Sequence, residues 1–448
     1  MEIKFLYKFT LSISLTVMVI FIKGLAYTNA QTEPLDLLTS NDEEIQVLKS
    51  KIKSIESNVQ FTEIPEINLL RIENPNKSIK DLVEHSEEVK LSGKLANNIQ
   101  ANNNSEKDII KIDENLSISQ KSNLENELLS RLTWHIDKLT DNKNSLNYSK
   151  GEGVKIALID SGVDKVHPLL KNSIDLRNAK SFVTKEKSIE DTNGHGTMVA
   201  GIISQVSPKA KITPYRVLSS ADGESIWTLK AMIKAIHDKQ DIMNMSLGTY
   251  KSENIESDKL TIEAFKRVVN LAQKRNIIII SSSGNKSLNL DDNYNENRVL
   301  HLPGDLDGVI TVSATNKDDK LASYSNIGTP VELAAPGGEL IIDENGALDA
   351  REMIYTSYPL NLKNVYKEAG IPNGYTLTHG TSLSAAGISG IFANYYSYHL
   401  RELKEKPSVQ EAVSNIAKSS KDLGPIGRDI QYGYGIPDSL KSYNLITE

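Results

Sequence analysis

From about residue 150 onward, short apolar runs alternate with amphipathic segments. The runs 154–160, 276–285 and 308–315 begin apolar and end in small, polar or acidic residues. Between the first two runs, the segments 228–239 and 261–275 repeat their hydrophobic positions at helical spacing. Strands that are apolar along their whole length are typical of a sheet covered on both faces. We therefore expect an α/β fold with a doubly wound, mostly parallel sheet, whose functional residues follow the carboxyl ends of the strands.

Residues 31–95 show a different pattern, which predicts a small α+β domain. Hydrophobic residues at helical spacing within 45–55 predict a helix, and the short runs 59–64 and 66–73 predict two strands. A second helix is expected after Asn76, whose side chain is a good helix cap. The expected order of elements is therefore helix, strand, strand, helix.

The stretch NNIQANNNSEKD (97–108) is rich in Asn and polar throughout. We expect residues 96–129 to form an exposed linker or processing region, followed by the large domain at 130–448. The alternative is that everything before the large domain is one irregular N-terminal domain.

The N-terminus predicts a secretory signal peptide. Lys4 and Lys8 precede an apolar run of 14 residues, 9–22, and small residues follow at Thr28 and Ala30. We expect cleavage after Ala30 and a secreted, extracellular protein with no membrane span after signal removal. The apolar run is shorter than the about 20 residues that a comfortable membrane helix needs. An uncleaved N-terminal anchor is the alternative.

Composition narrows the classes of function. The chain has 448 residues, a formal net charge of −7 and no Cys, so a disulfide framework or a thiolate metal site is impossible. There is no basic block of the kind that binds nucleic acid, and we expect no nucleic-acid partner. We expect a monomer.

Four polar residues lie where an apolar run ends or a helix is expected to begin, which are common positions for catalytic residues. Asp160 ends an apolar run, His195 lies between two glycines at the start of a helix-like segment, and Asn285 follows a run and a Gly. Ser382, in HGTSLSAAGISG, is expected at a helix N-terminus, where the helix dipole favours developing negative charge. A serine hydroxyl needs a base to take its proton, and the base needs an acid to hold its tautomer. The Asn285 amide could donate to an oxyanion.

Each of these residues has a simpler interpretation when taken alone. An Asp after a strand, or a Ser in a Gly-Thr-Ser turn, is commonly only a helix cap. Their joint presence in the order acid, base, nucleophile is what indicates catalysis. The other histidines lack the glycine frame of His195, and we assign them no chemistry: His85, His135, His167, His237, His301, His379 and His399.

The order Asp160, His195, Ser382, within the motifs DSG, GHGTMVAG and GTSLS, resembles the subtilisin-like serine proteases, the subtilases. The resemblance covers roughly residues 130–440 and includes SSSGN, NMSLG and ELAAPGG. It implies a catalytic triad of these three residues, with Asn285 in the oxyanion hole. It further implies that the walls of the substrate cleft are formed by Ser246, Leu247, Gly248, Ser283 and Gly284.

Residues 31–95 resemble the propeptide of secreted subtilases, which implies a folding aid and inhibitor removed by self-cleavage. The chain departs from the family at Ala386, where Pro is usual, and at Gly387, where His or Ile is common. These departures imply shifted helix packing with retained activity. The helix after His195 runs on without the calcium-binding loop that many subtilases insert there. No metal or other cofactor is required by the implied chemistry, and a structural calcium elsewhere is left open.

Within the family, the chain is similar to lantibiotic leader peptidases of Gram-positive bacteria. That similarity implies a modified peptide precursor as substrate, cut after Arg. A pocket for Arg needs a carboxylate, and we expect it at Asp291 or Asp292, with Glu296 and Asp305 as further candidates. The alternatives are a broad-specificity degradative extracellular subtilase and, in another class, an inactive peptide-binding subtilase fold.

Overall fold

The fold is described from a computed structural model, for residues 33–101, 132–184, 186–219, 222–342, 348–368 and 370–447. The expected signal peptide and most of the expected linker lie outside these residues. Within the described part of the chain, no helix is long and apolar enough to cross a membrane.

The helices, including three short 3₁₀ turns, are α1 (Asp42–Ile55), η1 (Pro65–Ile67), α2 (Lys77–Glu84), α4 (Trp134–Leu139), η2 (Asn144–Asn147), α5 (His195–Val206), α6 (Ser225–His237), α7 (Glu256–Lys274), α8 (Leu290–Asn297), η3 (Ala350–Glu352), α9 (Thr381–Leu403), α10 (Val409–Ser419) and α11 (Ser439–Thr447). The strands are β1 (Leu35–Leu38), β2 (Phe61–Ile64), β3 (Leu69–Ile72), β4 (Leu91–Gly93), β5 (Gln100–Ala101), β6 (Lys155–Asp160), β7 (Lys180–Ser181), β8 (Lys211–Arg216), β9 (Ile242–Met245), β10 (Leu247–Ser252), β11 (Ile278–Ser282), β12 (Val299–Leu302), β13 (Val309–Thr315), β14 (Val331–Pro336), β15 (Ile354–Ser357) and β16 (Tyr375–Thr378).

The large domain is built on a seven-stranded sheet in the order β14-β13-β11-β9-β6-β8-β7. All neighbouring strands in it run parallel. Strand β6 comes first in the chain and lies between β8 and β9, so the chain winds outward from it in both directions. The predicted α/β fold with a parallel sheet is confirmed, and a functional site is expected where the winding reverses.

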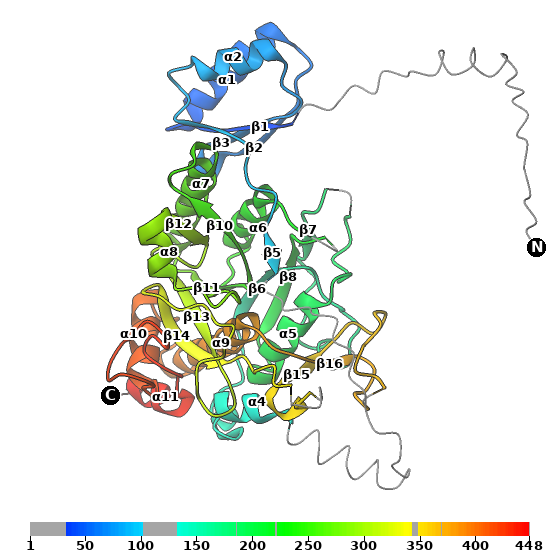
Figure 1. Ribbon diagram of the computed structural model, residues 1–448, viewed down its shortest axis with the longest axis vertical. Helices are drawn as coiled ribbons and strands as arrows, with labels where there is room; N and C mark the ends of the chain where they lie inside the picture. Colours follow the sequence, from blue (N-terminus) through cyan, green and yellow to red (C-terminus); the bar gives the residue numbers. More distant parts are fainter. Residues whose placement is uncertain are drawn as a thin grey trace, which may run out of the picture.

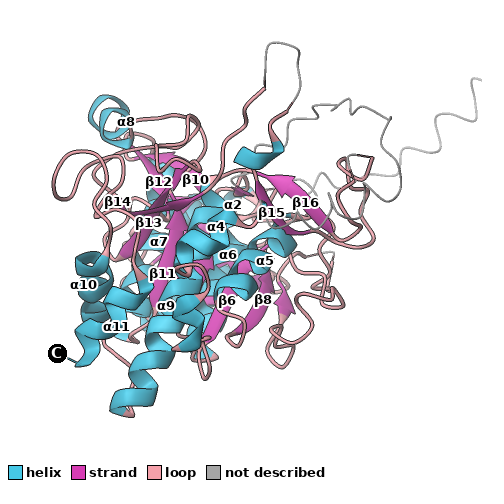
Figure 2. Ribbon diagram, turned by 90° about the horizontal axis from the view of Figure 1, so that it is seen from below, coloured by secondary structure: helices cyan, strands magenta, loops and turns pink. Residues whose placement is uncertain are grey.

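Both faces of this sheet are covered, which explains its continuous apolar strands. In β6, Ile156 and Leu158 pack into the cluster that contains α5 and α9, whereas Ala157 and Ile159 pack into the cluster that contains α6 and α7. Figure 2 shows α5 and α9 alongside the strands of the sheet. Because successive side chains of a strand point to opposite faces, a strand between two helical layers has no polar face.

The N-terminal unit is an antiparallel sheet in the order β2-β3-β1-β4, with two helices on one face. Helices α1 and α2 share a small core with Leu37, Leu70 and Ile72. The other face, with Leu38 and Leu69, packs on α6 and α7 of the large domain. Figure 1 shows this sheet between α1 and α2 on its outer side and α7 below it. Strands β1 and β4 were not predicted, because they are too short to show alternation.

The prediction of an exposed linker is wrong at Ile99. Ile99 is fully buried, and β5 pairs with β10. Ile99 also exchanges backbone hydrogen bonds with Gly223, its N–H donating at 3.0 Å and its carbonyl accepting at 2.8 Å. The Asn-rich composition predicts a solvent-exposed loop. Residues 99–101 instead pair their backbone groups with Gly223 and β10.

Helix α9 crosses the large domain and is buried over most of its length. At Gly387, an added Cβ would lie 2.6 Å from Leu139 Cδ1, so the side chain of Leu139 occupies the space beside this glycine. Ala386, where the family usually has Pro, is a regular helical residue here. The close approach of Leu139 gives a physical reason for the absence of a larger side chain at Gly387.

Candidate active site

The carboxyl end of the sheet gathers the residues predicted to be catalytic. Asp160 is the last residue of β6, His195 opens α5, and Ser382 lies in the first turn of α9. Helices α5 and α9 pack against each other on the same face of the sheet. All three side chains are buried.

Asp160 and His195 form a direct hydrogen bond. His195 Nδ1 lies 2.7 Å from Asp160 Oδ1, which also accepts the backbone N–H of Ser161 at 2.7 Å. An ionised carboxylate only accepts, so Nδ1 carries the proton and donates it. The ring then presents Nε2 as an unprotonated acceptor. His195 Nε2 is buried and has no hydrogen-bond partner among the described residues.

The hydroxyl of Ser382 is held by the strand region beside it. Ser382 Oγ donates to the carbonyl of Ser246 at 3.2 Å, and Ser246 Oγ donates to the carbonyl of Ser382 at 2.9 Å. This reciprocal pair joins the first turn of α9 to the residue before β10. Asn244 steadies Ser246 by donating to its hydroxyl at 3.0 Å. Hydrogen bonds between nucleophile and base often form only when substrate is bound.

A second buried carboxylate, Asp191, ties the turn of Asp160 to the turn of His195. It accepts from the hydroxyl of Ser161 at 2.9 Å, the N–H of Gly194 at 2.8 Å, and both the N–H and hydroxyl of Thr197. Burial raises the pKa of this carboxyl, and the hydrogen bonds oppose that shift. Sequence reasoning missed Asp191, although its position shortly before a Gly-framed His is a signal for a side-chain-bonded turn.

The orientation of the Asn285 amide is determined by the residue before Ser382. Asn285 Oδ1 accepts the backbone N–H of Thr381 at 3.0 Å and its hydroxyl at 2.7 Å. Because both Thr381 groups donate to it, this atom must be the oxygen, and Nδ2 points the other way. Asn285 is therefore fixed with its donor end turned away from Thr381.

One expected wall of the cleft, Ser246 to Gly248, begins strand β10. Leu247 pairs with Ala101 and Gly248 with Gln100, so the N-terminal unit places a strand on this wall. Thr249 adds a side-chain hydrogen bond to Asn98 at 3.0 Å. At Gly248, an added Cβ would lie 2.3 Å from His301 Nε2 and 2.8 Å from the carbonyl oxygen of Leu302, so no side chain fits.

The other expected wall, Ser283 and Gly284, follows β11 and leads into Asn285. Both residues are buried, and Gly284 has φ of +103°, a conformation that favours glycine. The N–H of Gly284 donates to the hydroxyl of Thr381 at 3.2 Å. The wall is therefore bonded to the same residue that orients the Asn285 amide.

Of the four candidate pocket acids, Asp291 and Asp305 line the same cavity. Asp291 accepts the N–H of Thr329 at 2.9 Å and its hydroxyl at 2.9 Å, whereas Asp292 and Glu296 are exposed on α8. Asp305 is the one acid joined to the β10 wall, because its carboxylate accepts the N–H of His301 at 2.7 Å. Its other oxygen is buried without a partner, and burial raises the pKa of Asp305 to about 7.

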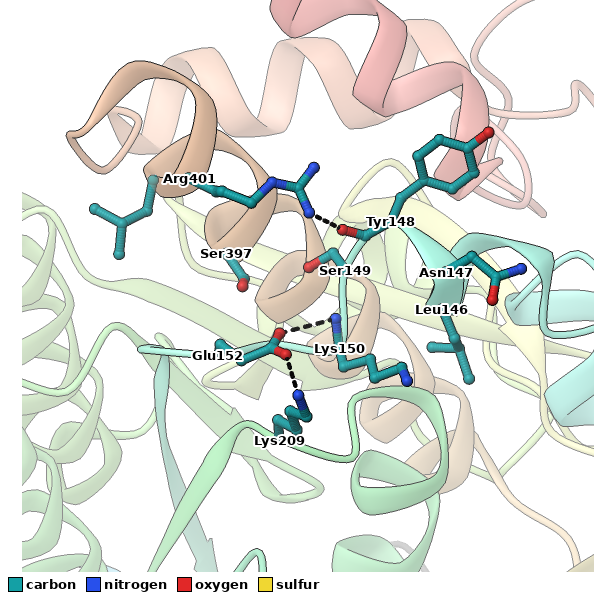
Figure 3. A pocket seen from close by; sticks show the side chains of 10 residues that line it. Leu146, Asn147, Tyr148, Ser149, Lys150, Glu152, Lys209, Ser397 and Arg401 are labelled. Carbon is teal, nitrogen blue, oxygen red and sulfur yellow. Dashed lines mark hydrogen bonds and ion pairs between the residues drawn. The ribbon is translucent and has the colours of Figure 1, made fainter.

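Figure 3 shows a separate cavity of about 540 Å³, which contains none of the predicted site residues. It lies between the end of α9 and the segments that lead into β6 and β8. Its polar groups bond to one another: Arg401 donates to the carbonyl of Tyr148, and Glu152 pairs with Lys209 at 2.7 Å. Over the described ranges, no group of three or more His, Cys, Asp or Glu side chains is arranged to hold a metal ion.

The chain resembles known leader-processing proteases in sequence and structure. It is 27% identical to the "epidermin leader peptide-processing serine protease EpiP" of Staphylococcus epidermidis, over 94% of this chain and 95% of that protein. A solved lanthipeptide protease matches with a TM-score of 0.67 and 34% identity, over 71% of this chain and 96% of that one. The EpiP structure from Staphylococcus aureus matches in fold, with a TM-score of 0.72 and 24% identity, over 93% of this chain and 99% of that one.

The subtilase family (Peptidase S8) matches residues 151–435, which is most of the large domain. This range holds Asp160, His195, Asn285 and Ser382, and the parallel sheet places the first two in hydrogen-bond contact. The chain therefore belongs to the subtilase family of serine proteases.

Proposed function

We propose that the protein removes the leader from a lantibiotic precursor, cutting after Arg through an Asp160–His195–Ser382 triad. Ser382 Oγ attacks the scissile carbonyl carbon while His195 Nε2 takes its proton. His195 then gives that proton to the departing amine, which leaves an acyl group on Ser382. Water, deprotonated by His195, attacks the acyl carbon. The bond to Ser382 Oγ then breaks, Ser382 Oγ regains a proton from His195, and the new carboxyl terminus is released. Asp160 stays ionised and holds the imidazole in the required tautomer.

The tetrahedral intermediate carries a negative oxygen, for which we assign two donors. One is the amide Nδ2 of Asn285, which the contacts of Thr381 with Oδ1 turn away from α9. The other is the backbone N–H of Ser382, in the first turn of α9, where the helix dipole also favours an anion.

The observation that carries this proposal is the strand β5 on the edge of β10. A peptide from the same chain lies antiparallel to Leu247 and Gly248 with its backbone hydrogen-bonded, as an extended substrate would. Just before β5, the backbone of Ile99 bonds to Gly223, and its side chain packs in the core with α6 and α7. The N-terminal unit is accordingly proposed as a propeptide that inhibits by occupying the substrate cleft.

Polar contacts between the two parts support a specific inhibitory complex. Arg71, which is buried and paired with Asp36 at 2.6 Å, reaches Glu224 of the large domain at 3.3 Å. From the other side, Arg267 of α7 donates to the carbonyls of Thr39 at 2.8 Å and Ile67 at 2.9 Å. We propose that the protein acts outside the cell, as a monomer, after losing its signal peptide and this unit.

Self-processing of the full chain tests the nucleophile. Ser382→Ala should remain at its full length after signal removal, whereas the wild type should lose the N-terminal unit. Because β5 ends opposite Leu247, the new N-terminus should fall among the residues that closely follow Ala101, as read by N-terminal sequencing. Ser384→Ala is the matched control: Ser384 is a buried hydroxyl on α9 that donates to the carbonyl of Ala335 at 2.9 Å. Normal maturation of Ser382→Ala in a protease-deficient host would refute the proposal.

Substrate preference is tested with peptides that differ only in Arg, Lys, Phe or Leu before the scissile bond. We expect Arg to be preferred, with Asp305 as the acid that favours it. Because the pKa of Asp305 is raised to about 7, its charge appears as the pH rises through that value. The ratio of kcat/KM for Arg over Phe should therefore rise across this range, and Asp305→Asn should flatten the rise. Any pH dependence that the two substrates share cancels in the ratio. A preference for Phe or Leu at every pH would instead indicate a broad degradative protease.

A further inference from the structure

One buried side chain fastens the loop that carries Asn285 from both ends. Asn326, in the connection between β13 and β14, is fully buried. Its Nδ2 donates to the carbonyl of Ser283 at 2.8 Å, and its Oδ1 accepts the N–H groups of Lys286 and Leu288, each at 3.0 Å. These bonds lie before and after Asn285 in the chain, so the Asn326 amide brackets it.

The backbone of Asn326 adds two more bonds to the same loop. Its N–H donates to the carbonyl of Gly284 at 2.9 Å, and its carbonyl accepts the hydroxyl of Ser283 at 3.1 Å. The fit is close, because a Cβ on Gly284 would lie 2.5 Å from Asn326 Nδ2. The path of the loop into Asn285 is therefore set by contact with this one residue.

Asn326 also reaches the strand on which the substrate is proposed to bind. Its Nδ2 donates to the hydroxyl of Tyr250 in β10 at 2.8 Å. The ammonium of Lys286 lies 4.4 Å from the centre of the Tyr250 ring, which closes the contact between loop and strand from the other side. The side-chain amide of Asn326 thus joins the loop that carries Asn285 to β10.

We propose that Asn326 is a positioning residue for the oxyanion donor, acting through Asn285; this rests on the proposed role of Asn285. An oxyanion donor stabilises the transition state only when it is already in place before charge develops. Thr381 sets the rotation of the Asn285 amide, and Asn326 sets the backbone from which that amide projects. Displacement of a catalytic group by about 1 Å can cost about 100-fold in rate.

A double-mutant cycle tests the proposal on the mature enzyme with one peptide substrate. Asn326→Ala should lower kcat by about 10-fold to 100-fold with little change in KM. In the Asn285→Ala background, the same change should lower kcat by less than about 3-fold, because the donor it positions is already gone. Variants that self-process slowly are matured with a trace of affinity-tagged wild type, which is removed before the assay.

Asn394→Ala is the matched control for loss of a buried Asn. Asn394 is also fully buried on α9, where it donates to the carbonyl of Val206 and accepts from Ser207, each at 2.8 Å. It should lower the melting temperature while leaving kcat unchanged. If Asn326→Ala fails to fold, the cycle is run with Asn326→Asp, which keeps the acceptor for Lys286 and Leu288 and should lower kcat by less.

Two failures are distinguishable in this experiment. An equal loss of kcat from the Asn326 change in both backgrounds, or a rise in KM alone, overturns the positioning role. An Asn285→Ala variant with unchanged kcat overturns the proposed oxyanion hole itself, and with it the basis for the inference.

Discussion

Thr381 sets the orientation of the Asn285 amide. Its hydroxyl donates to Asn285 Oδ1 and accepts the N–H of Gly284, so one side chain bonds both the proposed oxyanion donor and the expected cleft wall. The adjacent residue, Ser382, is the proposed nucleophile. A change at Thr381 should therefore affect catalysis without direct contact between its side chain and substrate.

We predict that Thr381→Val lowers kcat by about 5-fold to 50-fold and leaves KM nearly unchanged. Valine has a similar shape but lacks the hydroxyl, so Asn285 Oδ1 keeps only the backbone N–H of residue 381 and the amide is held less firmly. Thr381→Ser keeps the hydroxyl and should retain most of the activity. Steady-state kinetics of the mature enzymes on one peptide provide the measurement, and equal losses in the two variants would contradict the prediction.

At this scale, sequence reasoning proposes a role only for residues that are marked by their immediate neighbours. Asp160, His195 and Ser382 each lie at a junction flagged by glycine or by the end of an apolar run. It fails where the role depends on contacts distant in sequence. Asn326 is marked by nothing locally, because its partners Ser283 and Tyr250 lie on other elements.

Strand β10 has two partner strands, and each constrains which residues fit in it. It pairs with β12 on one edge and with β5 on the other. Its first residues leave room for His301 beside Gly248 and pair their backbone with β5. The apolar runs located β6, β11 and β13 of the central sheet. Strand β5 has two residues, and its pairing is set by main-chain bonds that no side-chain pattern reports.

We predict that Gly248→Ala raises KM by about 10-fold or more. The new Cβ would meet His301 Nε2 and the Leu302 carbonyl, which forces the strand toward the substrate. Gly427→Ala is the control: nothing lies within 4 Å of the position of its Cβ, but its φ of +90° strains an alanine, so the change should lower stability without raising KM. Initial rates over a range of peptide concentrations measure the effect, and an unchanged KM in Gly248→Ala would show that this edge does not bind substrate.

Two of the buried histidines, His135 and His301, are kept neutral by the fold. Burial lowers the pKa of His135 to about 3 and that of His301 to about 4. In the unfolded chain, both take a proton near pH 6.5. Stability from these groups is therefore present above about pH 6.5 and is lost as the pH falls toward 4 and then 3. Asp305, with its pKa raised to about 7, opposes this trend between pH 7 and 4.

We predict that His135→Phe makes the free energy of unfolding less dependent on pH between about 6.5 and 3. Loss of one such group should reduce the slope by up to about 1.4 kcal/mol per pH unit. Urea unfolding of the Ser382→Ala chain, which cannot digest itself in the proposed mechanism, gives the measurement with and without the His135 change. Identical slopes would show that folding does not lower the pKa of His135.

The docking of the N-terminal unit on α6 and α7 has a consequence for timing. While the chain is intact, β5 is tethered beside β10 at a high effective concentration that does not depend on how much protein is present. Cutting the chain after β5 ends the tether but leaves the docked surface in place. In the proposed mechanism, the cut N-terminal unit then leaves only by dissociating, and whether it rebinds depends on dilution. The proposed first cut would therefore proceed at a rate independent of protein concentration, whereas the amount of free enzyme would increase on dilution.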